Sequence, residues 1–175
     1  KTMKRKPIVA IVGRPNVGKS TFVNRLVGRR QSIVDDLPGV TRDRIYFDVE
    51  WQNKWFTAID TGGIIPSDED EIMVSIYDQA KIACDVAEKI IFIVDGKDGV
   101  TPVDEEIANI LRQTKKPVFL AVNKVDSPAQ ALYTSEFYSL ALGDPIGISA
   151  LHGSGGVGDL LELVTEDFEA DDELE

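Results

Sequence analysis

The chain has 175 residues, 43% of them hydrophobic, and a net charge of −11. This length suggests a single domain, and the longest apolar runs are strand-sized, far short of the ~20 residues of a membrane-spanning helix. The basic start leads into a strand-like run rather than a cleavable apolar segment, so we expect no secretory signal. The single cysteine, Cys84, excludes an internal disulfide and is typical of a reducing compartment.

Strand-like and helical patterns alternate along the chain. Strands are expected at residues 8–12, 45–51, 55–59, 89–95, 117–123 and 146–149. Helices are expected at residues 21–27, 72–87, 127–142 and 158–168, with a further helix beginning at Thr101. Strands separated by single helices form mostly parallel sheets covered on both faces, and the first hairpin adds one antiparallel edge strand. The predicted fold is therefore a three-layer α/β domain with a six-stranded sheet, whose ligands collect where the strands end.

The segment between the first strand and the first helix fits the phosphate-binding pattern G-x-x-x-x-G-K-[ST]. Gly13 and Gly18 let the backbone wrap closely round a phosphate, and the start of the following helix adds positive potential. Lys19 would reach the outer phosphates, and the hydroxyl of Ser20 would hold Mg²⁺. The predicted phosphate loop consists of Gly13, Arg14, Pro15, Asn16, Val17, Gly18, Lys19, Ser20 and Thr21.

A second polar cluster, Asp-Thr-Gly-Gly at residues 60–63, comes directly after the third predicted strand. The carboxylate of Asp60 can hold Mg²⁺ through water, and the amide of Gly63 can sense whether a γ-phosphate is present. Turns use the same residue types, so the position of this cluster about forty residues beyond a phosphate loop is what makes it informative.

Two more clusters point to the base of a nucleotide. Asp126 can accept hydrogen bonds from N1–H and the 2-amino group of guanine, which adenine does not offer. Asn123 would tie the base to the phosphate loop, and the stem of Lys124 would lie over the ring. After the last strand come Ser149, Ala150 and Leu151, where an amide near Ala150 could meet guanine O6.

Several of these residues also have a purely structural interpretation. Asp126 could cap a helix, and Asn16 could be no more than a turn former. His152 follows the last strand, but a loop residue beside the base has no route to the γ-phosphate, so we do not expect it to be a catalytic base.

With these motifs the sequence resembles the Era-like group of the translation-factor-related GTPases, and within it the first GTPase domain of the Der (EngA) family. Besides the clusters above, the resemblance rests on residues 38–44, Pro-Gly-Val-Thr-Arg-Asp-Arg, and residues 136–140, Glu-Phe-Tyr-Ser-Leu. It runs through nearly the whole chain. It implies a Ras-like P-loop GTPase fold that hydrolyses GTP to GDP with Mg²⁺ and acts in assembly of the large ribosomal subunit.

The resemblance also implies roles for individual residues. Thr41 corresponds to the first-switch threonine, which meets Mg²⁺ and the γ-phosphate. Ile64 stands where Ras-like enzymes have a water-positioning glutamine, so intrinsic hydrolysis should be slow. Related enzymes use an asparagine like Asn16 to help bind a monovalent cation, so we expect K⁺, but not Na⁺, to speed hydrolysis. The expected catalytic residues are Lys19, Asn16, Thr41 and Gly63, and the expected metal ligands are Ser20, Thr41 and Asp60.

Domain organisation follows from the same comparison. We expect an N-terminal extension at residues 1–6, the GTPase domain at 7–168 and an acidic linker or tail at 169–175, where Der proteins continue to a second GTPase domain and a KH-like domain. Seven of the last ten residues are acidic, so the rest of the chain carries only −4 and offers no direct nucleic-acid footprint. Expected partners are those domains and the large ribosomal subunit, in bacterial cytoplasm or plastid stroma, with no membrane.

A different class of function stays open at this point. The domain could be a nucleotide-sensing binding module whose loops at residues 29–44 and 61–71 dock a partner, with negligible hydrolysis. A phosphoryl-transferring kinase is disfavoured, because the sequence from Asn123 to Asp126 is typical of guanine recognition and no acceptor-binding lid is apparent.

Overall fold

The computed structural model describes residues 6–27, 45–62, 69–153 and 155–170, and within these ranges the predicted alternation of strands and helices is confirmed. The strands are β1 (Ile8–Val12), β2 (Ile45–Trp51), β3 (Lys54–Asp60), β4 (Lys89–Asp95), β5 (Val118–Asn123) and β6 (Ile146–Gly147). The helices are α1 (Lys19–Val27), α2 (Glu69–Val86), α3 (Pro102–Arg112), η1 (Pro128–Leu140) and α4 (Val157–Thr165).

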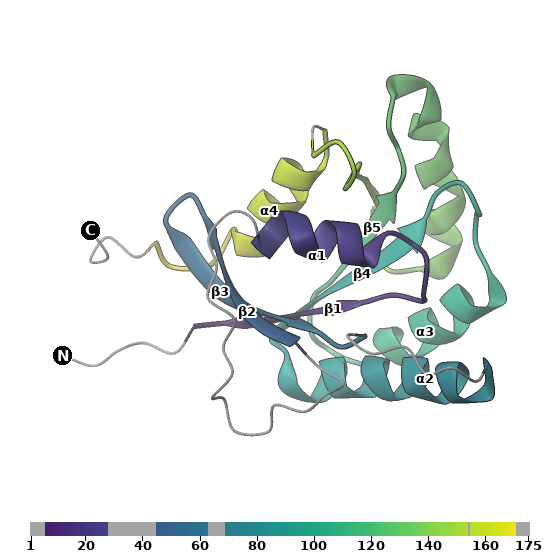
Figure 1. Ribbon diagram of the computed structural model, residues 1–175, viewed down its shortest axis with the longest axis horizontal. Helices are drawn as coiled ribbons and strands as arrows, with labels where there is room; N and C mark the ends of the chain where they lie inside the picture. The colour runs from purple at the N-terminus through teal and green to yellow at the C-terminus, as the bar shows by residue number, and fades with distance from the viewer. Residues whose placement is uncertain (1–5, 28–44, 63–68, 154, 171–175) are drawn as a thin grey trace.

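The strands form one sheet in the order β2-β3-β1-β4-β5-β6. All neighbours are parallel except the β2–β3 hairpin, which places one antiparallel strand at the edge. Its turn residues Gln52 and Asn53 have φ values of 51° and 66°, as a two-residue hairpin turn requires. Helices α1 and α4 lie on one side of the sheet and α2 and α3 on the other (Figure 1). The predicted three-layer fold is confirmed.

Both faces of the sheet are buried, because side chains of the central strands alternate between two cores. In β1, Val9 and Ile11 pack with α1 and α4, whereas Ala10 and Val12 pack with α2, α3 and η1. All seven side chains of β4 are buried. Such continuous apolar strands are what a parallel sheet covered on both faces requires.

The segment predicted as a helix at residues 127–142 is helical but wound more tightly, as the 3₁₀ helix η1. The hydroxyl of Thr134 donates to the carbonyl of Ala131 at 2.8 Å, and that of Ser135 to the carbonyl of Leu132 at 2.8 Å. These side chains compete for carbonyls that an α-helix would use. Apolar periodicity alone could not distinguish the two helix types.

Two further elements are shorter than the sequence predicts. Strand β6 ends at Gly147, and α4 ends at Thr165 rather than at residue 168. The ammonium groups of Lys89 and Lys54 donate to the carbonyls of Val164 and Thr165 at 2.8 and 3.0 Å, which satisfies the end of α4. Ala170, in the predicted acidic tail, forms an isolated antiparallel bridge with Lys54.

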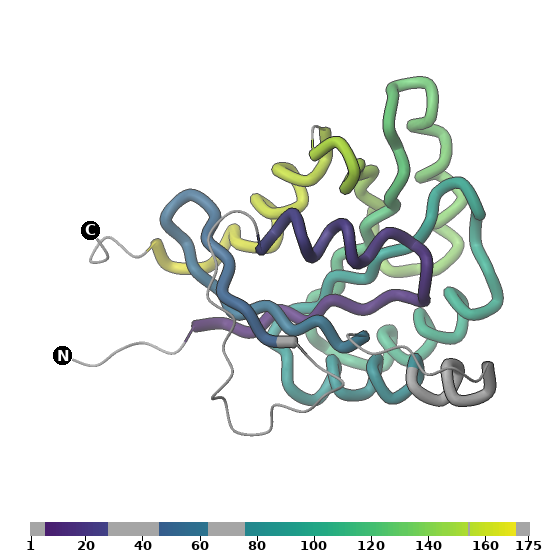
Figure 2. The backbone as a smooth tube through the Cα atoms, viewed as in Figure 1, coloured from purple at the N-terminus to yellow at the C-terminus, as the bar shows by residue number. Residues whose placement is uncertain are grey.

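The strands β1, β3, β4 and β5 all end at the same edge of the sheet, on the right of the view in Figure 2. The loop between β1 and α1, drawn in purple, turns back at this edge. Because all the predicted nucleotide-binding clusters follow these strands or β6, the fold brings them together.

Candidate functional site

The phosphate loop leaves β1 at Val12, and α1 begins at Lys19. Val17 is fully buried and fixes the loop to the core, while Asn16 is exposed. Gly18 has a φ of 93°, and a Cβ there would lie 2.1 Å from Nδ2 of Asn123. Gly18, the second glycine of the pattern, is therefore required both by its backbone conformation and by the close approach of the Asn123 side chain.

Lys19 points towards the end of β3. Its Nζ lies 3.2 Å from Oδ1 of Asp60, and the two residues are only 9% and 6% exposed. The amide of Gly62 donates to the same Asp60 oxygen at 3.0 Å, and the hydroxyl of Thr61 donates to the carbonyl of Ile11 at 3.1 Å. These contacts hold the Asp-Thr-Gly cluster against β1 and place its carboxylate beside the phosphate loop.

The donor set at this point fits Mg²⁺. The hydroxyl of Ser20, at the exposed first turn of α1, and the carboxylate of Asp60 are hard oxygen donors of the kind Mg²⁺ prefers, and it usually keeps waters and substrate phosphates as its other ligands. Among the described residues no group of three or more His, Cys, Asp or Glu side chains could hold a metal. Two expected residues, Thr41 and Gly63, lie outside the described residues.

The side chain of Asn123 joins the two halves of the site. Its Nδ2 donates to the carbonyl of Val17 at 2.9 Å, and its Oδ1 accepts from the amide of Ala150 at 2.9 Å. Asn123 is only 3% exposed, and a buried donor or acceptor without a hydrogen bond would cost free energy of folding. The amide predicted to meet guanine O6 is thus already a donor to Asn123, and a base oxygen would have to share it.

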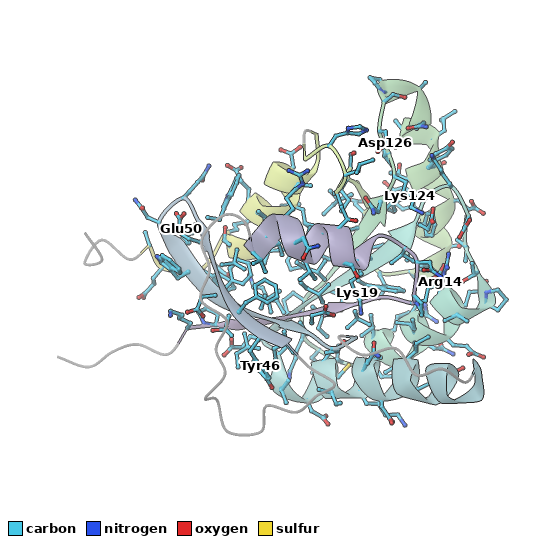
Figure 3. All side chains as sticks on the ribbon, in the orientation of Figure 1. Arg14, Lys19, Tyr46, Glu50, Lys124 and Asp126 are labelled. Carbon is cyan, nitrogen blue, oxygen red and sulfur yellow. The ribbon has the colours of Figure 1, made fainter. Side chains whose placement is uncertain are left out.

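Lys124 and Asp126 are each held by a neighbour. Lys124 has a φ of 70°, and its Nζ donates to Oδ2 of Asp95 at 2.7 Å and to the carbonyl of Asn16 at 3.5 Å. The hydroxyl of Ser149 donates to Oδ1 of Asp126 at 2.7 Å. Asp126 is exposed, and its labelled side chain lies with those of Lys124, Arg14 and Lys19 at one end of the sheet (Figure 3).

Asp95 was not singled out in the sequence, yet its carboxylate holds the ammonium group of Lys124. It is 2% exposed and also accepts from the amides of Lys97 and Asp98 at 2.8 and 3.2 Å. Burial alone would raise the pKa of Asp95, but these hydrogen bonds and the Lys124 ammonium outweigh it and hold the pKa below its usual value. The carboxylate therefore stays charged opposite Lys124.

Arg14 connects the phosphate loop to the start of α3. Its Nη2 donates to Oδ2 of Asp98 at 2.9 Å, and its Nε lies 3.4 Å from Oδ1 of the fully buried Asp104. Asp104 also completes a capping box with Thr101, as the sequence predicts for the start of this helix. The first variable position of the loop is thus an ionic anchor.

Arg25, which the sequence did not single out either, binds the loop after β6. Its guanidinium donates to the carbonyls of Ala150 and Leu151. No local pattern marks it, because its partners lie 125 and 126 residues further along the chain. His152 is exposed and lies in the same loop, where its backbone amide donates to the hydroxyl of Ser149 at 3.4 Å.

The family described as 50S ribosome-binding GTPase matches residues 8–124. The chain belongs to this GTPase family. It is similar to GTPase Der of Acetivibrio thermocellus, with 58% identity over 95% of this chain and 38% of that protein. It is similar to GTPase Der of Clostridium kluyveri, with 56% identity over 93% of this chain and 37% of that protein. The chain thus spans well under half the length of these curated relatives.

Solved structures of GTPases agree with this family membership. An Era variant of Aquifex aeolicus bound to GDP.AlF4⁻ superposes with a TM-score of 0.73 at 32% identity, covering 96% of this chain and 58% of that one. The G domain of the FeoB iron transporter of Thermotoga maritima superposes with a TM-score of 0.65 at 26% identity, covering 93% and 98%. The resemblance to Der and to the Era-like group, and with it the P-loop GTPase fold, is confirmed. In the described part of the chain, no helix combines the length and apolar character needed to cross a membrane.

Proposed function

We propose that this domain binds guanine nucleotides at the carboxyl edge of its sheet and hydrolyses GTP to GDP. One observation carries the proposal: buried Asn123 hydrogen-bonds both the phosphate loop, at Val17, and the base-side loop, at Ala150. A single side chain thereby fixes the distance between the group that would hold phosphates, Lys19, and the group that would read the base, Asp126. A nucleotide is the ligand that has an anion at one end and a hydrogen-bonding ring at the other.

The phosphate end would be held by charge and by backbone donors. Lys19 and the amides at the start of α1 would neutralise and orient the phosphates, with the helix dipole adding to the potential. The residues Ser20 and Asp60, together with Thr41, would hold Mg²⁺, which when bound supplies further positive charge at the phosphates. Gly63 would donate its amide to the γ-phosphate.

The base end would select guanine. The hydroxyl of Ser149 donates to Oδ1 of Asp126 at 2.7 Å, which orients the carboxylate. A carboxylate placed this way rewards the two donors of guanine and leaves itself unpaired against adenine. Lys124, held by Asp95, would lay its alkyl stem over the ring.

Hydrolysis should be slow in this domain on its own. Position 64 is isoleucine and offers no polar atom to orient the attacking water. The same observation favours a second candidate function, a nucleotide-sensing module with negligible hydrolysis. A measurable single-turnover rate with GTP in the isolated domain supports the enzyme, and no detectable turnover over many hours supports the module.

The experiment that tests the proposal is nucleotide competition with Asp126→Asn. The wild-type domain should prefer GDP over ADP by at least about a hundredfold, because adenine would leave the Asp126 carboxylate without the two donors that guanine offers. The asparagine variant should lose guanine affinity and gain affinity for xanthosine diphosphate, whose 2-oxo group needs a donor. Undiminished GDP binding by the variant would overturn the assignment of Asp126.

We further propose that the domain works within a longer protein. Its relatives are more than twice as long, so a second GTPase domain, a KH-like domain and binding to the large ribosomal subunit in bacterial cytoplasm or plastid stroma are proposed from the Der similarity. Residues 7–168 would be the GTPase domain, with residues 1–6 as an extension and 169–175 as the linker. Co-sedimentation of the full-length protein with large subunits, in GTP analogue but not in GDP, would test this.

A further inference from the structure

The guanidinium of Arg25 is shared between two consecutive carbonyls of a distant loop. Its Nε donates to the carbonyl of Ala150 at 2.6 Å, and its Nη2 donates to the carbonyl of Leu151 at 2.7 Å. A planar guanidinium presents parallel donors in a fixed fork, which suits two neighbouring oxygens, whereas a lysine ammonium cannot span them in the same way. Both peptide units after Ala150 and Leu151 are therefore fixed relative to α1.

Both backbone polar groups of Ala150, its amide and its carbonyl, are hydrogen-bonded by side chains of the site. While Arg25 binds its carbonyl, the Oδ1 of Asn123 accepts from its amide at 2.9 Å. Gly153 follows two residues after Leu151, and a Cβ there would come within 2.1 Å of Nη1 of Arg25. The glycine thus leaves the space that the guanidinium fills. Ala150 is fully buried although the neighbouring Leu151 is 67% exposed. The contacts of Arg25 and Asn123 with the Ala150 backbone therefore lie on the inner side of the loop.

Arg25 connects the loop after β6 to helix α1. Helix α1 begins at Lys19 and Ser20, and Arg25 projects from the same helix less than two turns later. Through Arg25 the base-side loop is attached to the helix that carries the phosphate-binding residues. Asn123 makes a second, independent connection between the two loops.

We propose that Arg25 is a positioning residue for guanine recognition: by binding the carbonyls of Ala150 and Leu151 it holds in place the loop whose backbone amides would meet O6 of the base. This inference rests on the proposed function. Arg25 acts through the loop that would meet O6, whereas Asp126 would read the neighbouring N1–H and 2-amino group. Loss of Arg25 therefore weakens discrimination at O6 and leaves discrimination at the 2-amino group.

Three nucleoside diphosphates separate recognition of O6 from recognition of the 2-amino group. GDP carries both features, 6-thio-GDP replaces O6 with a poorly accepting sulfur, and IDP lacks the 2-amino group. For Arg25→Gln we expect the GDP dissociation constant to rise by up to about tenfold, the loss of roughly one neutral hydrogen bond from a loop amide to O6. The preference for GDP over 6-thio-GDP should shrink by a similar factor, while the preference for GDP over IDP stays within about twofold of wild type. Arg25→Lys, which keeps the charge and can reach one carbonyl, should give the same pattern at smaller size.

Arg112 provides the matched control. Its guanidinium also donates to a carbonyl, that of Leu140, and to Oδ1 of Asn109 at 2.7 Å, but on α3 rather than beside the base-side loop. Arg112→Gln should leave both preferences unchanged, and thermal unfolding checks that all variants are folded. If Arg25→Gln does not fold, Arg25→Lys decides the question alone.

The outcomes separate this inference from the proposed function. Unchanged GDP and 6-thio-GDP binding in the Arg25 variants overturns the inference, and so does an equal loss of both preferences, which would indicate general damage to the site. A wild-type domain that binds no GDP overturns the proposed function first. A wild-type domain that binds GDP, beside an Arg25 variant that discriminates equally well, overturns only the positioning role.

Discussion

Lys19 and Asp60 form a buried ion pair in which Nζ lies 3.2 Å from Oδ1. Their side chains are 10% and 8% exposed, so each charge depends on the other for compensation. A phosphate that draws Lys19 away leaves Asp60 in need of a new positive partner, which Mg²⁺ would supply. The pair therefore couples the two ligands that the site is proposed to bind.

The first prediction concerns Lys19→Ala. We expect GDP affinity to fall by about ten- to a hundredfold, because a charge-assisted hydrogen bond to phosphate contributes about 1.5–3 kcal/mol. We also expect the free energy of unfolding to fall by about 3–5 kcal/mol, because Asp60 is left as an unpaired buried charge. Isothermal titration with GDP and denaturant unfolding measure the two effects.

The double variant Lys19→Ala/Asp60→Asn separates binding from folding. Removing both charges should restore most of the lost stability, since no uncompensated carboxylate remains, but it should not restore GDP binding. A properly folded Lys19→Ala domain that holds GDP as tightly as wild type would contradict the phosphate-binding role of the whole loop.

The second prediction concerns Asp95 and acid. Because its pKa is held below the usual value in the folded state, Asp95 stabilises the fold above its unfolded pKa of about 4, and this contribution is lost as pH falls through the lower folded pKa. In Asp95→Asn the contribution is absent at every pH. Wild type should thus lose more stability than the variant between about pH 5 and pH 2, measured by thermal unfolding. Parallel curves for the two proteins would show that Lys124 does not stabilise the charged form of Asp95.

The sequence predicts those parts of the site whose chemistry is contiguous. The phosphate loop, the Asp60 cluster and the residues from Asn123 to Asp126 each have their proposed function within a few positions, so spacing alone is enough to predict them. Thr41 and Gly63 remain predictions outside the described residues.

The supporting residues could not be found in this way. Arg25 and Asp95 act on partners that are distant in sequence, 125 and 29 residues away, and nothing next to them differs from an ordinary helix arginine or strand-end aspartate. Their contacts exist only once the parallel sheet has brought the loops to one edge. The same holds for η1, whose 3₁₀ winding depends on where hydroxyl groups find acceptors rather than on apolar periodicity.

The third prediction concerns Asp104 beside Arg14. Burial raises the pKa of this carboxyl, against the opposing effects of Thr101 and Arg14, and among the described residues neither Oδ1 nor the facing Nε of Arg14 makes a hydrogen bond. A raised pKa means that the folded state binds the proton more readily, so the charged carboxylate costs stability above its folded pKa. This cost disappears as pH falls towards the unfolded pKa of about 4. In the wild type the Thr101 amide donates to Oδ2 of Asp104, and the one oxygen that Asp104→Asn keeps can take that place. This variant should therefore equal or exceed wild-type stability at pH 7.

The comparison of pH profiles tests this explanation of Asp104. The difference between Asp104→Asn and wild type should be greatest near neutral pH and should vanish by about pH 4. Thr101→Ala is the control, because it removes the helix cap and should cost about 1 kcal/mol. If Asp104→Asn is less stable than wild type at pH 7 by as much as this control, the ion pair with Arg14 outweighs the cost of burying the carboxylate.

The fourth prediction concerns Asn16 and potassium. Asn16 is exposed at a φ of 70°, and its carbonyl accepts from Lys124 at 3.5 Å. Its side-chain amide makes no hydrogen bond to any other described residue. If that amide helps to hold K⁺ beside the phosphates, GTP turnover should be several-fold faster in KCl than in NaCl at equal ionic strength, through added positive charge at the bridging oxygen. Asn16→Gly is the decisive variant, because glycine keeps the positive φ and removes only the side chain. It should bind GDP as wild type does and turn over GTP equally slowly in both salts. Equal wild-type rates in KCl and NaCl would leave Asn16 as a turn former, which its backbone conformation already explains.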